Sequence, residues 1–380
     1  MICSKSIFIA SSIMLSINLQ GCARLFKKDD SHPQLSEYSS QFNSVVIFGD
    51  SLSDTGNIDL LSRAAKDIPG SGVSKAYPIS PPYKEGRFSN GEIWVDKFLR
   101  DLKLSPPSSH DCFFNININR ACNFAIGGSS TSSMQNSENI LFKKITDFFK
   151  NDFVTNYLKK FQILMKIGVK EMIKEYLKIN KPDDYALNHT LYVIWAGGND
   201  YLQKADPSLT VNNIIESIKI ISDYSPSNDK KYFLIPNLPD LGKTPYAIKR
   251  TEEIEILTDR SYKHNSILNE QLEFLENQPQ YKDKIVIIKL KIENLFKEII
   301  SSPASYGFKK VNEACYSKNY SENDGNICSK PEEYLFWDEI HPSTRAHCLI
   351  ANLAEKALID AQLLKNLIIN DNECNSKKDS

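Results

Sequence analysis

Five short apolar runs limit the folds open to this chain. Each is brief and rich in β-branched or aromatic residues, and they cover residues 44–49, 122–127, 190–197, 231–236 and 284–290. The first run shows no polar alternation, so we expect a strand that is covered on both faces. Segments long enough for crossover helices, such as 209–222 and 252–277, lie between the runs. Strands that alternate with helices predict an α/β fold with a parallel sheet.

Two further segments have helical periodicity. A final helix is predicted over residues 343–368, because small and apolar residues recur on one face: Ala346, Ile350, Leu353, Ala357 and Ala361. Residues 138–182 form a lysine-rich and aromatic-rich insertion. Basic amphipathic helices of this kind lie at a membrane surface, or they pack as a helical pair whose lysines solvate the outer face. A lid over a pocket is compatible with both interpretations.

The first residues have the pattern of an export signal. Lys5 precedes an apolar stretch over residues 7–17, which is too short to span a bilayer as a helix. This predicts a signal peptide over residues 1–21 and export from a bacterial cell. The tetrapeptide LQGC at 19–22 also resembles a bacterial lipoprotein signal, which would make Cys22 the first, lipidated residue. Simple cleavage nearby is the alternative, so we expect a secreted protein or one that is lipid-anchored at the outer membrane.

The rest of the chain has the length of one large domain. Residues 22–43 are polar and rich in helix breakers, which suits a tether. We expect a single domain over 44–370 that includes the insertion at 138–182, followed by a short tail over 371–380. The formal net charge of -1 and the pI near 6.6 provide no global basic field, which argues against nucleic acid as a partner.

The cysteine count agrees with an oxidising compartment. Of the 8 cysteines, all but Cys3 and Cys22 lie beyond the predicted signal, and their number is even. The pairs that are near in sequence are the natural expectation, although other connectivities stay open: Cys112 with Cys122, Cys315 with Cys328, and Cys348 with Cys374. No cysteine pair has the C-x₂-C spacing of a zinc site and no histidine pair stands beside one, so we expect no metal.

The stretch VVIFGDSLSDTGN, at 45–57, places a serine where the first predicted strand ends. In an open parallel sheet, ligands bind outside the carboxyl ends of the strands, so Ser51 would be placed for reaction. A simpler role is that Ser51, Ser53 or Asp54 caps the start of a helix. The stretch taken alone favours this simpler role.

A serine nucleophile needs a base, and that base is usually histidine. In the segment WDEIHP, Asp338 stands three residues before His341, close enough for its carboxylate to hold the imidazole in the required tautomer. Pro342 disfavours the helical conformation at His341, which predicts a loop just ahead of the final helix. A local hydrogen bond that only tightens the turn is the alternative. His347 falls inside the predicted helix, and His264 is expected to be structural or to lie at the surface.

Acyl transfer also needs hydrogen-bond donors that face the developing oxyanion. Two glycine-rich stretches follow predicted strands: NFAIGGSST at 123–131 and WAGGND at 195–200. In the first, glycine lets the backbone approach a substrate and present an N–H. In the second, Asn199 would offer its side-chain amide. Each stretch alone is commonly just a turn.

Four blocks together resemble the GDSL, or SGNH, family of serine esterases and lipases. FGDSLSDTGN, NFAIGGSST, GGND and WDEIHP occur in that order and at suitable intervals, from about Val45 to the final helix. The resemblance implies a three-layer α/β/α sandwich around a parallel, flavodoxin-like sheet of about five strands. The lysine-rich segment would then be a helical insertion in this SGNH hydrolase fold.

The resemblance also assigns roles to residues. Ser51 matches the nucleophile of the family, and Asp338 and His341 match its acid and base. The oxyanion hole would consist of the Ser51 N–H, the N–H of Gly128 and the Asn199 amide. Gly127 adjoins Gly128 and is the residue most easily confused with it. No cofactor and no metal are implied, because these groups supply the needed chemistry.

Within the family, the residues of the FGDSLSDTGN and WDEIHP motifs are most similar to those of secreted bacterial phospholipases A, lysophospholipases and glycerophospholipid:cholesterol acyltransferases. The segment 315–328 is similar to a disulfide-bounded loop in some of those acyltransferases. We therefore expect a phospholipid or lysophospholipid substrate, a sterol as a candidate acceptor, and peripheral contact with a membrane. Deacylation of carbohydrates or small esters is the alternative, and a non-catalytic surface lipoprotein that binds lipid or a host molecule is a second one.

Overall fold

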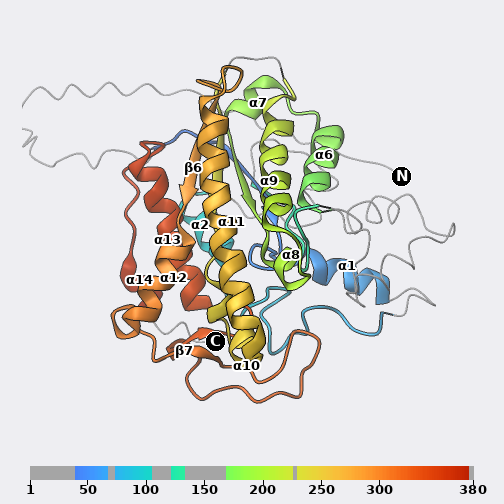
Figure 1. The fold of residues 1–380 in the computed structure, drawn as a ribbon, viewed down its shortest axis with the longest axis vertical. Helices are drawn as coiled ribbons and strands as arrows, with labels where there is room; N and C mark the ends of the chain where they lie inside the picture. Colours follow the sequence, from blue (N-terminus) through green and yellow to red (C-terminus); the bar gives the residue numbers. More distant parts are fainter. Residues whose placement is uncertain (1–38, 67–72, 105–120, 133–167, 226–228, 376–380) are drawn as a thin grey trace, which may run out of the picture. The chain divides into compact units, whose positions relative to one another are not determined.

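The five apolar runs form the strands of one parallel sheet (Figure 1). In spatial order they are β3 (Cys122–Asn123), β2 (Ser44–Gly49), β4 (Thr190–Trp195), β5 (Lys231–Pro236) and β6 (Ile285–Leu290), and every neighbouring pair is parallel. Along the chain this order is 2-1-3-4-5, the flavodoxin-like arrangement. The structure is a computed structural model, and it describes residues 39–66, 73–104, 121–132, 168–225 and 229–375. The prediction of a parallel sheet of five strands is confirmed, although β3 is shorter than the run at 122–127.

Alternate residues of the four longer strands, β2, β4, β5 and β6, face two separate hydrophobic cores. Val46 and Phe48 of β2 lie in one core, while Val45 and Ile47 lie in the other. Among the described helices, most of the residues that complete the first core come from α1 (Asn57–Lys66), α6 (Val169–Asn180), α9 (Pro207–Ser222) and the later turns of α11 (Thr251–Asn277). The second is completed by α2 (Trp94–Asp101), α12 (Ile292–Ser301) and α13 (Thr344–Asp360). Helices therefore cover both faces, which confirms the three-layer sandwich.

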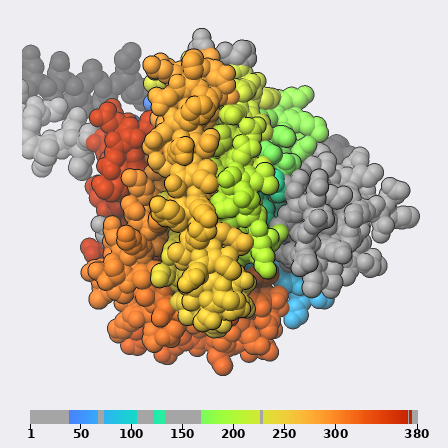
Figure 2. All heavy atoms as spheres, in the orientation of Figure 1, coloured from blue at the N-terminus to red at the C-terminus, as the bar shows by residue number. Residues whose placement is uncertain are grey.

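Helix α11 is the longest of the described helices. It runs the length of the face shown in Figures 1 and 2, beside α9. Leu268, Leu272 and Leu275 pack in the first core, whereas Leu257, nearer the start of α11, packs in the second. One helix thus contacts both cores.

Shorter elements connect these layers. They are α7 (Asp184–Asn188), α8 (Gly198–Leu202), α10 (Pro245–Lys249) and the parallel pair β7 (Lys310–Ala314) and β8 (Tyr334–Phe336). Three single turns of 3₁₀ helix lie at Leu241–Lys243, Pro303–Tyr306 and Pro331–Glu333. Among the described residues, none of the helices combines the length and the apolar character needed to cross a membrane.

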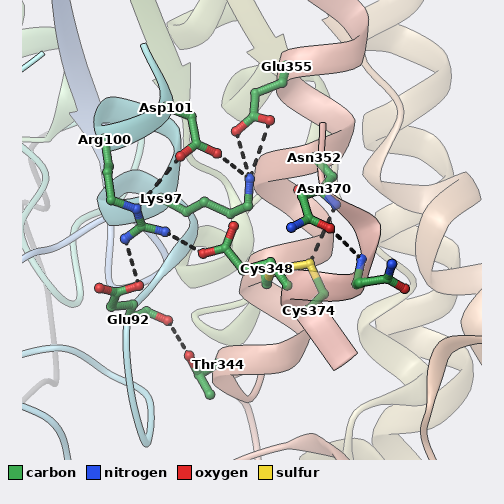
Figure 3. Close-up of a disulfide and its surroundings, with 12 residues drawn as sticks. Glu92, Lys97, Arg100, Asp101, Thr344, Cys348, Asn352, Glu355, Asn370 and Cys374 are labelled. Atoms are coloured by element: carbon green, nitrogen blue, oxygen red, sulfur yellow. Dashed lines mark hydrogen bonds and ion pairs between the residues drawn. A yellow bond between two sulfur atoms is a disulfide. The ribbon is translucent and has the colours of Figure 1, made fainter. Parts of the chain in front are cut away.

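Helix α2 packs against α13 through a cluster of charged side chains (Figure 3). The Lys97 ammonium lies between the carboxyl groups of Asp101 and Glu355, and it is 3.2 Å from the Glu355 Oε1. Lys97 and Glu355 are both buried. Nearby, the Arg100 guanidinium pairs at 2.9 Å with Glu373. These contacts connect α2 to α13 and to the C-terminal helix α14 (Asp371–Asn375).

Two of the three predicted disulfides are present. Cys315 is bonded to Cys328, and Cys348 in α13 is bonded to Cys374 in α14. Figure 3 shows the second bond beside the charged cluster. Cys122 is a free cysteine in the structure. Its predicted partner, Cys112, lies outside the described residues, so this third pairing stays a prediction.

The final helix is shorter than the periodicity predicts. It ends at Asp360 and not near residue 368, because Gln362 adopts a left-handed conformation with φ 59° and the chain turns. Leu364–Lys365 then form β9, which pairs antiparallel with β1 (Ser39–Ser40). Leu364 is buried in this strand, which removes its apolar side chain from water.

The folded unit is also longer at both ends than the predicted 44–370. Ser39–Ser40, assigned to the tether, are part of β1, and Phe42 is buried. At the other end, Cys374 is disulfide-bonded within the segment expected to be a tail. The predicted signal peptide and Cys22 lie outside the described residues.

Only the last part of the predicted insertion at 138–182 lies within the described residues. Its helix α6 buries Met172, Ile173 and Tyr176 in the first core, while Lys174 is exposed. This part therefore packs on the core, with a lysine on its outer face. The prediction for residues 138–167 lies outside the described part of the chain.

Candidate active site

Three of the predicted site segments follow neighbouring strands. Ser51 follows β2, Gly128 follows β3, and Asn199 lies in α8 just after β4. Because β3, β2 and β4 are adjacent and parallel, their carboxyl ends share one edge of the sheet. Hydrogen bonds between the three segments then fix the arrangement in detail.

The Asp54 carboxylate joins the segments that follow β2 and β3. It accepts hydrogen bonds from the backbone N–H groups of Gly56, Asn57 and Ile58, and also from that of Gly127 at 2.7 Å. Burial raises the pKa of Asp54 to about 6, although these hydrogen bonds act in the opposite direction. Asp54 is therefore an organiser of the turn, in agreement with its expected capping role.

A second carboxylate joins the segments that follow β3 and β4. Asp200 accepts a hydrogen bond from the Thr131 hydroxyl at 2.6 Å and another from the Thr131 N–H at 3.0 Å. Burial raises the pKa of Asp200 to about 6 against these two bonds. The adjacent Asn199 donates from its amide nitrogen to the Ser129 carbonyl at 3.0 Å. Since an amide nitrogen carries two hydrogens, one remains for a further acceptor.

The two neighbouring glycines have different environments. The Gly127 N–H is used by Asp54, and a Cβ at Gly127 would lie 2.4 Å from the ring of Phe88. Gly128 has a φ of 84°, a conformation that favours glycine, and it is half-buried. Within the described part of the chain, the Gly128 N–H donates no hydrogen bond. Gly128, and not Gly127, is thus the residue whose N–H can receive a new acceptor.

Ser51 and His341 come together from distant parts of the sequence. The Ser51 Oγ lies 2.9 Å from the His341 Nε2, across 290 residues of chain. The His341 Nδ1 in turn lies 2.7 Å from the Asp338 Oδ2. All three residues are largely buried. The structure therefore brings the three predicted residues into one continuous chain of hydrogen bonds.

The segment between β8 and α13 holds this histidine in place. The Trp337 N–H donates to the His341 carbonyl at 2.8 Å, which closes the turn. The Asp338 Oδ1 accepts the backbone N–H groups of Ile340 and His341 at 2.8 and 2.7 Å. Helix α13 begins at Thr344, so His341 lies on a loop just ahead of the helix, as Pro342 predicts.

Two carboxyl groups near His341 have opposite pKa shifts. Burial works to raise the pKa of Asp338, but the charge of His341 and the hydrogen bonds to the carboxylate outweigh it, so this pKa is lowered. Asp338 is therefore ionised at neutral pH. Burial raises the pKa of Asp50, the residue before Ser51, to about 7, against the hydrogen bond from Leu52 and the charge of His341.

Aromatic side chains that the sequence analysis did not identify surround the histidine. The ring of Phe88 lies 4.9 Å from that of His341, and Tyr320 approaches the same imidazole edge-on at 6.4 Å. Tyr83 donates from its hydroxyl to the Asp338 Oδ2 at 2.5 Å. No periodicity or spacing links these residues to His341 in the sequence, because only the tertiary fold brings them together.

An apolar cavity of about 50 Å³ opens beside Ser51. Gly198 and Asn199 lie on its wall next to the serine. The remaining wall is almost entirely hydrophobic and includes Leu52, Trp195, Leu202, Leu238, Pro239, Leu241, Ile292, Phe296, Phe336, Ile340 and Pro342. The apolar residues of 238–241 and of α12 were not predicted as site residues. A group bound through a polar atom near Ser51 would thus extend its remaining atoms over apolar surface.

His264 and His347 are both buried, so of the two roles expected for His264, structural or surface, the structural one holds. His264 is fully buried, and its Nδ1 lies 2.7 Å from the Tyr201 hydroxyl. Burial lowers its pKa to about 3, and that of His347 likewise. Among the described residues, no group of three or more histidine, cysteine, aspartate or glutamate side chains is arranged to hold a metal ion.

The structure thus places Ser51, Gly128 and Asn199 at one edge of a flavodoxin-like parallel sheet. The chain belongs to the GDSL-like lipase/acylhydrolase family, whose model matches residues 45–354. It is accordingly an enzyme of the lipase and esterase class.

Curated relatives from bacteria and plants are similar to this chain over most of its length. The phosphatidylcholine-sterol acyltransferase of Aeromonas hydrophila is 24% identical over 364 residues, covering 84% of this chain and 91% of the relative. A GDSL esterase/lipase of Arabidopsis thaliana is 25% identical, and the match covers 84% of this chain and 92% of the relative. The thermolabile hemolysin of Vibrio parahaemolyticus serotype O3:K6 (strain RIMD 2210633) is 25% identical, and the match covers 82% of this chain and 62% of the relative.

Solved structures at lower sequence identity are also similar to this chain. A carbohydrate acetylesterase from Sinorhizobium meliloti is 13% identical with a TM-score of 0.40, covering 84% of this chain and 99% of that one. The lipase/acylhydrolase from Enterococcus faecalis is 12% identical with a TM-score of 0.36, and the match covers 85% of this chain and 97% of that one.

Proposed function

We propose that this protein is an acyl hydrolase of lipid esters, a phospholipase A or lysophospholipase that works through an acyl-serine intermediate. The observation that carries the proposal is the hydrogen-bonded series Ser51, His341 and Asp338 at the mouth of an apolar cavity. A serine with its base and the carboxylate that orients the base has no use in a protein that only binds lipid.

In the first half-reaction, the His341 Nε2 accepts the Ser51 proton while the Ser51 Oγ forms a bond to the ester carbonyl carbon. Asp338 stabilises the imidazolium that results. The oxyanion is held by the N–H groups of Ser51 and Gly128 and by the second amide hydrogen of Asn199. His341 then gives its proton to the departing alcohol as the carbon–oxygen bond breaks, and an acyl-serine remains.

In the second half-reaction, an acceptor hydroxyl attacks the acyl-serine. With water as the acceptor, His341 takes the water proton and returns it to the Ser51 Oγ, which releases a fatty acid. With a sterol as the acceptor, the same proton transfers release a sterol ester. The name of the Aeromonas relative supports transfer to a sterol as an additional activity.

The chemical character of the cavity supports a lipid substrate. Its wall offers leucine, isoleucine, proline and aromatic side chains to an acyl chain, and Asp50 and Thr244 are the other polar residues on it besides Ser51 and Asn199. Its volume of about 50 Å³ supports a second candidate, hydrolysis of short-chain esters, because a long acyl chain needs the cavity to widen. Comparison of acyl chain lengths separates the two.

The first experiment tests the nucleophile. A fluorophosphonate probe is expected to label the purified protein covalently and to label Ser51→Ala not at all. Ser53→Ala is the matched control, because the Ser53 Oγ accepts a hydrogen bond from the Trp94 indole and makes none with His341. Labelling that persists in Ser51→Ala would refute the assignment, and absence of label in the unmodified protein would favour a binding protein.

The second experiment identifies the substrate. Phosphatidylcholine and lysophosphatidylcholine vesicles, with and without cholesterol, are incubated with the protein, and p-nitrophenyl acetate is tested in parallel. Release of fatty acid from either lipid supports the lipid proposal, and cholesteryl ester supports transfer. Turnover of the acetate ester without turnover of either lipid would establish the short-ester alternative instead.

Export is proposed on the basis of the N-terminal sequence. The protein would be secreted, or anchored at the outer membrane through a lipidated Cys22, where it would contact phospholipid directly. Metabolic labelling of an expressing bacterium with an alkyne fatty acid tests the anchor, with Cys22→Ala as the control. Label on the unmodified chain that Cys22→Ala loses supports lipidation, whereas an unlabelled mature chain in the medium supports simple cleavage.

A further inference from the structure

We propose that Tyr83 is a positioning residue of the reaction, whose hydroxyl limits how strongly Asp338 holds the protonated form of His341. This inference rests on the proposed function, because it concerns the acid that orients the base. Tyr83 would not touch the substrate and would act only through Asp338.

The geometry places Tyr83 and His341 on the same carboxylate oxygen. The Tyr83 hydroxyl donates to the Asp338 Oδ2 at 2.5 Å, and the His341 Nδ1 lies 2.7 Å from that oxygen. The other oxygen, Oδ1, accepts two backbone N–H groups. Each oxygen of Asp338 thus receives two donors, which uses its full acceptor capacity.

Close packing keeps the hydroxyl in this position. Tyr83 is only 2% exposed, and its ring meets Tyr316, Trp337 and Phe88 edge-on at centroid distances of 5.9, 6.2 and 6.5 Å. The hydroxyl cannot turn to solvent without displacing these rings. Burial, together with the neighbouring Asp338, raises the pKa of Tyr83 well above its ordinary value, so the hydroxyl remains a donor throughout the working pH range.

A donor on the shared oxygen changes the chemistry of the histidine. Tyr83 withdraws negative charge from the Asp338 Oδ2, so this oxygen attracts the imidazolium less strongly than an otherwise unoccupied carboxylate oxygen would. A less strongly held proton is transferred more easily from His341 to the leaving alcohol. Without the hydroxyl, His341 would stay protonated at higher pH and would be unavailable as a base there.

Other titratable groups also face this pair. Asp50 interacts electrostatically with His341 from the segment after β2, and His347 does so from α13. Tyr320, from the disulfide-bounded loop, interacts with Asp338. Replacing Tyr83 by phenylalanine leaves these three groups in place, so their contribution to the pH dependence is common to the variant and the unmodified enzyme.

The test compares Tyr83→Phe with Tyr316→Phe. Both hydroxyls belong to the same aromatic cluster around Trp337, but that of Tyr316 donates to the Glu322 carbonyl and not to Asp338. The readout is kcat/KM for a soluble ester as a function of pH, together with the melting temperature of each variant. A structural role alone would lower the melting temperature of both variants and leave the pH profile unchanged.

For Tyr83→Phe we expect the acidic limb of the profile to move to higher pH by about half to one unit, with KM changed less than about twofold. At pH values below the midpoint of the acidic limb, kcat/KM of Tyr83→Phe is then about three- to tenfold lower than that of the unmodified enzyme. Tyr316→Phe is expected to keep the original profile. An unshifted profile in Tyr83→Phe, or an equal shift in both variants, would overturn the inference.

Site-specific incorporation of 3-fluorotyrosine at position 83 covers the case in which Tyr83→Phe does not fold. This residue keeps the hydroxyl and makes it a stronger donor, so the limb is expected to move to lower pH, and an unmoved limb would count against the inference. Activity of Ser51→Ala, measured alongside, keeps the two proposals separate. If Ser51→Ala is inactive and the limb does not shift, only the role of Tyr83 fails, whereas an active Ser51→Ala removes the proposed function itself.

Discussion

Replacing Glu355 by glutamine is expected to stabilise the protein at neutral pH, although it removes a buried carboxyl group that contacts Lys97. The Lys97 ammonium has two carboxyl neighbours, and Asp101 is the closer of them. Burial of Lys97 works against its charge, but the hydrogen bond to Asp101 and the nearby Glu355 outweigh this effect and raise its pKa. Burial raises the pKa of Glu355 to about 8 in spite of Lys97, so Glu355 remains protonated at neutral pH.

The pH dependence follows from the difference between the folded and unfolded states. The unfolded chain releases the Glu355 proton near its ordinary pKa of 4.5, whereas the folded protein keeps the proton up to about pH 8. The contribution of this group to stability is therefore complete below pH 4.5 and is lost as the pH rises toward 8. The loss amounts to about 1.4 kcal/mol for each pH unit in this window. Relative to Glu355→Gln, the unmodified protein should lose about 2–3 kcal/mol between pH 5 and pH 7.

The assay is guanidinium unfolding followed by tryptophan fluorescence, without reductant, on both proteins at pH 5, 6 and 7. At pH 5 the two free energies of unfolding should agree within about 1 kcal/mol, and at pH 7 the variant should be the more stable. Glu373→Gln is the control, because it removes a carboxylate from the partly exposed pair with Arg100, which is worth at most about 1 kcal/mol. A difference between Glu355→Gln and the unmodified protein that does not change with pH would refute the reasoning.

Three further predictions concern the site. Asn199→Ala removes the proposed oxyanion donor and should lower kcat about 10²- to 10³-fold with little change in KM in steady-state assays, so a variant within about threefold of the original would remove Asn199 from the oxyanion hole. Gly127→Ala places a methyl group 2.4 Å from the Phe88 ring, which packs on His341, and should therefore reduce both kcat and the melting temperature; equal values in both assays would contradict the close packing. Phe296→Ala should widen the cavity and move the preference in an acyl chain-length series toward longer chains, and an unchanged preference would show that α12 does not bound the acyl site.

The sheet was predictable because each of its strands lies within a compact apolar run. The strand β2, SVVIFG, is buried at every residue, and such a run has few alternatives to a strand covered on both faces. The C-terminal end of α13 was not predictable in the same way. The apolar periodicity extends to Ala361, but the chain turns at Gln362 and Leu364–Lys365 then pair with Ser39–Ser40. This pairing is a contact across most of the sequence, so the local periodicity does not indicate it.

In the candidate site, too, the residues indicated by local spacing or by motifs were predicted, whereas those brought in only by the tertiary fold were not. Asp338 and His341 are three residues apart, so their contact is local and visible in the sequence, and the four motif blocks indicated Ser51 and Asn199. The apolar wall was missed, because Leu238 and Phe296 are ordinary core residues in sequence. Tyr83 was missed because it is 255 residues from Asp338, and its neighbouring prolines suggest only a turn.

The separation of Ser51 from its proposed base also has a consequence for synthesis. Ser51 is synthesised early in translation, and His341 follows 290 residues later, just before helix α13, which carries Cys348 of the Cys348–Cys374 disulfide. A polypeptide released early would carry the alcohol, the glycine-rich turn and the amide without any group to take the proton. Under the proposed mechanism, a chain that stops before His341 would lack the base and could not carry out the reaction, so activity would depend on synthesis of the segment that carries His341.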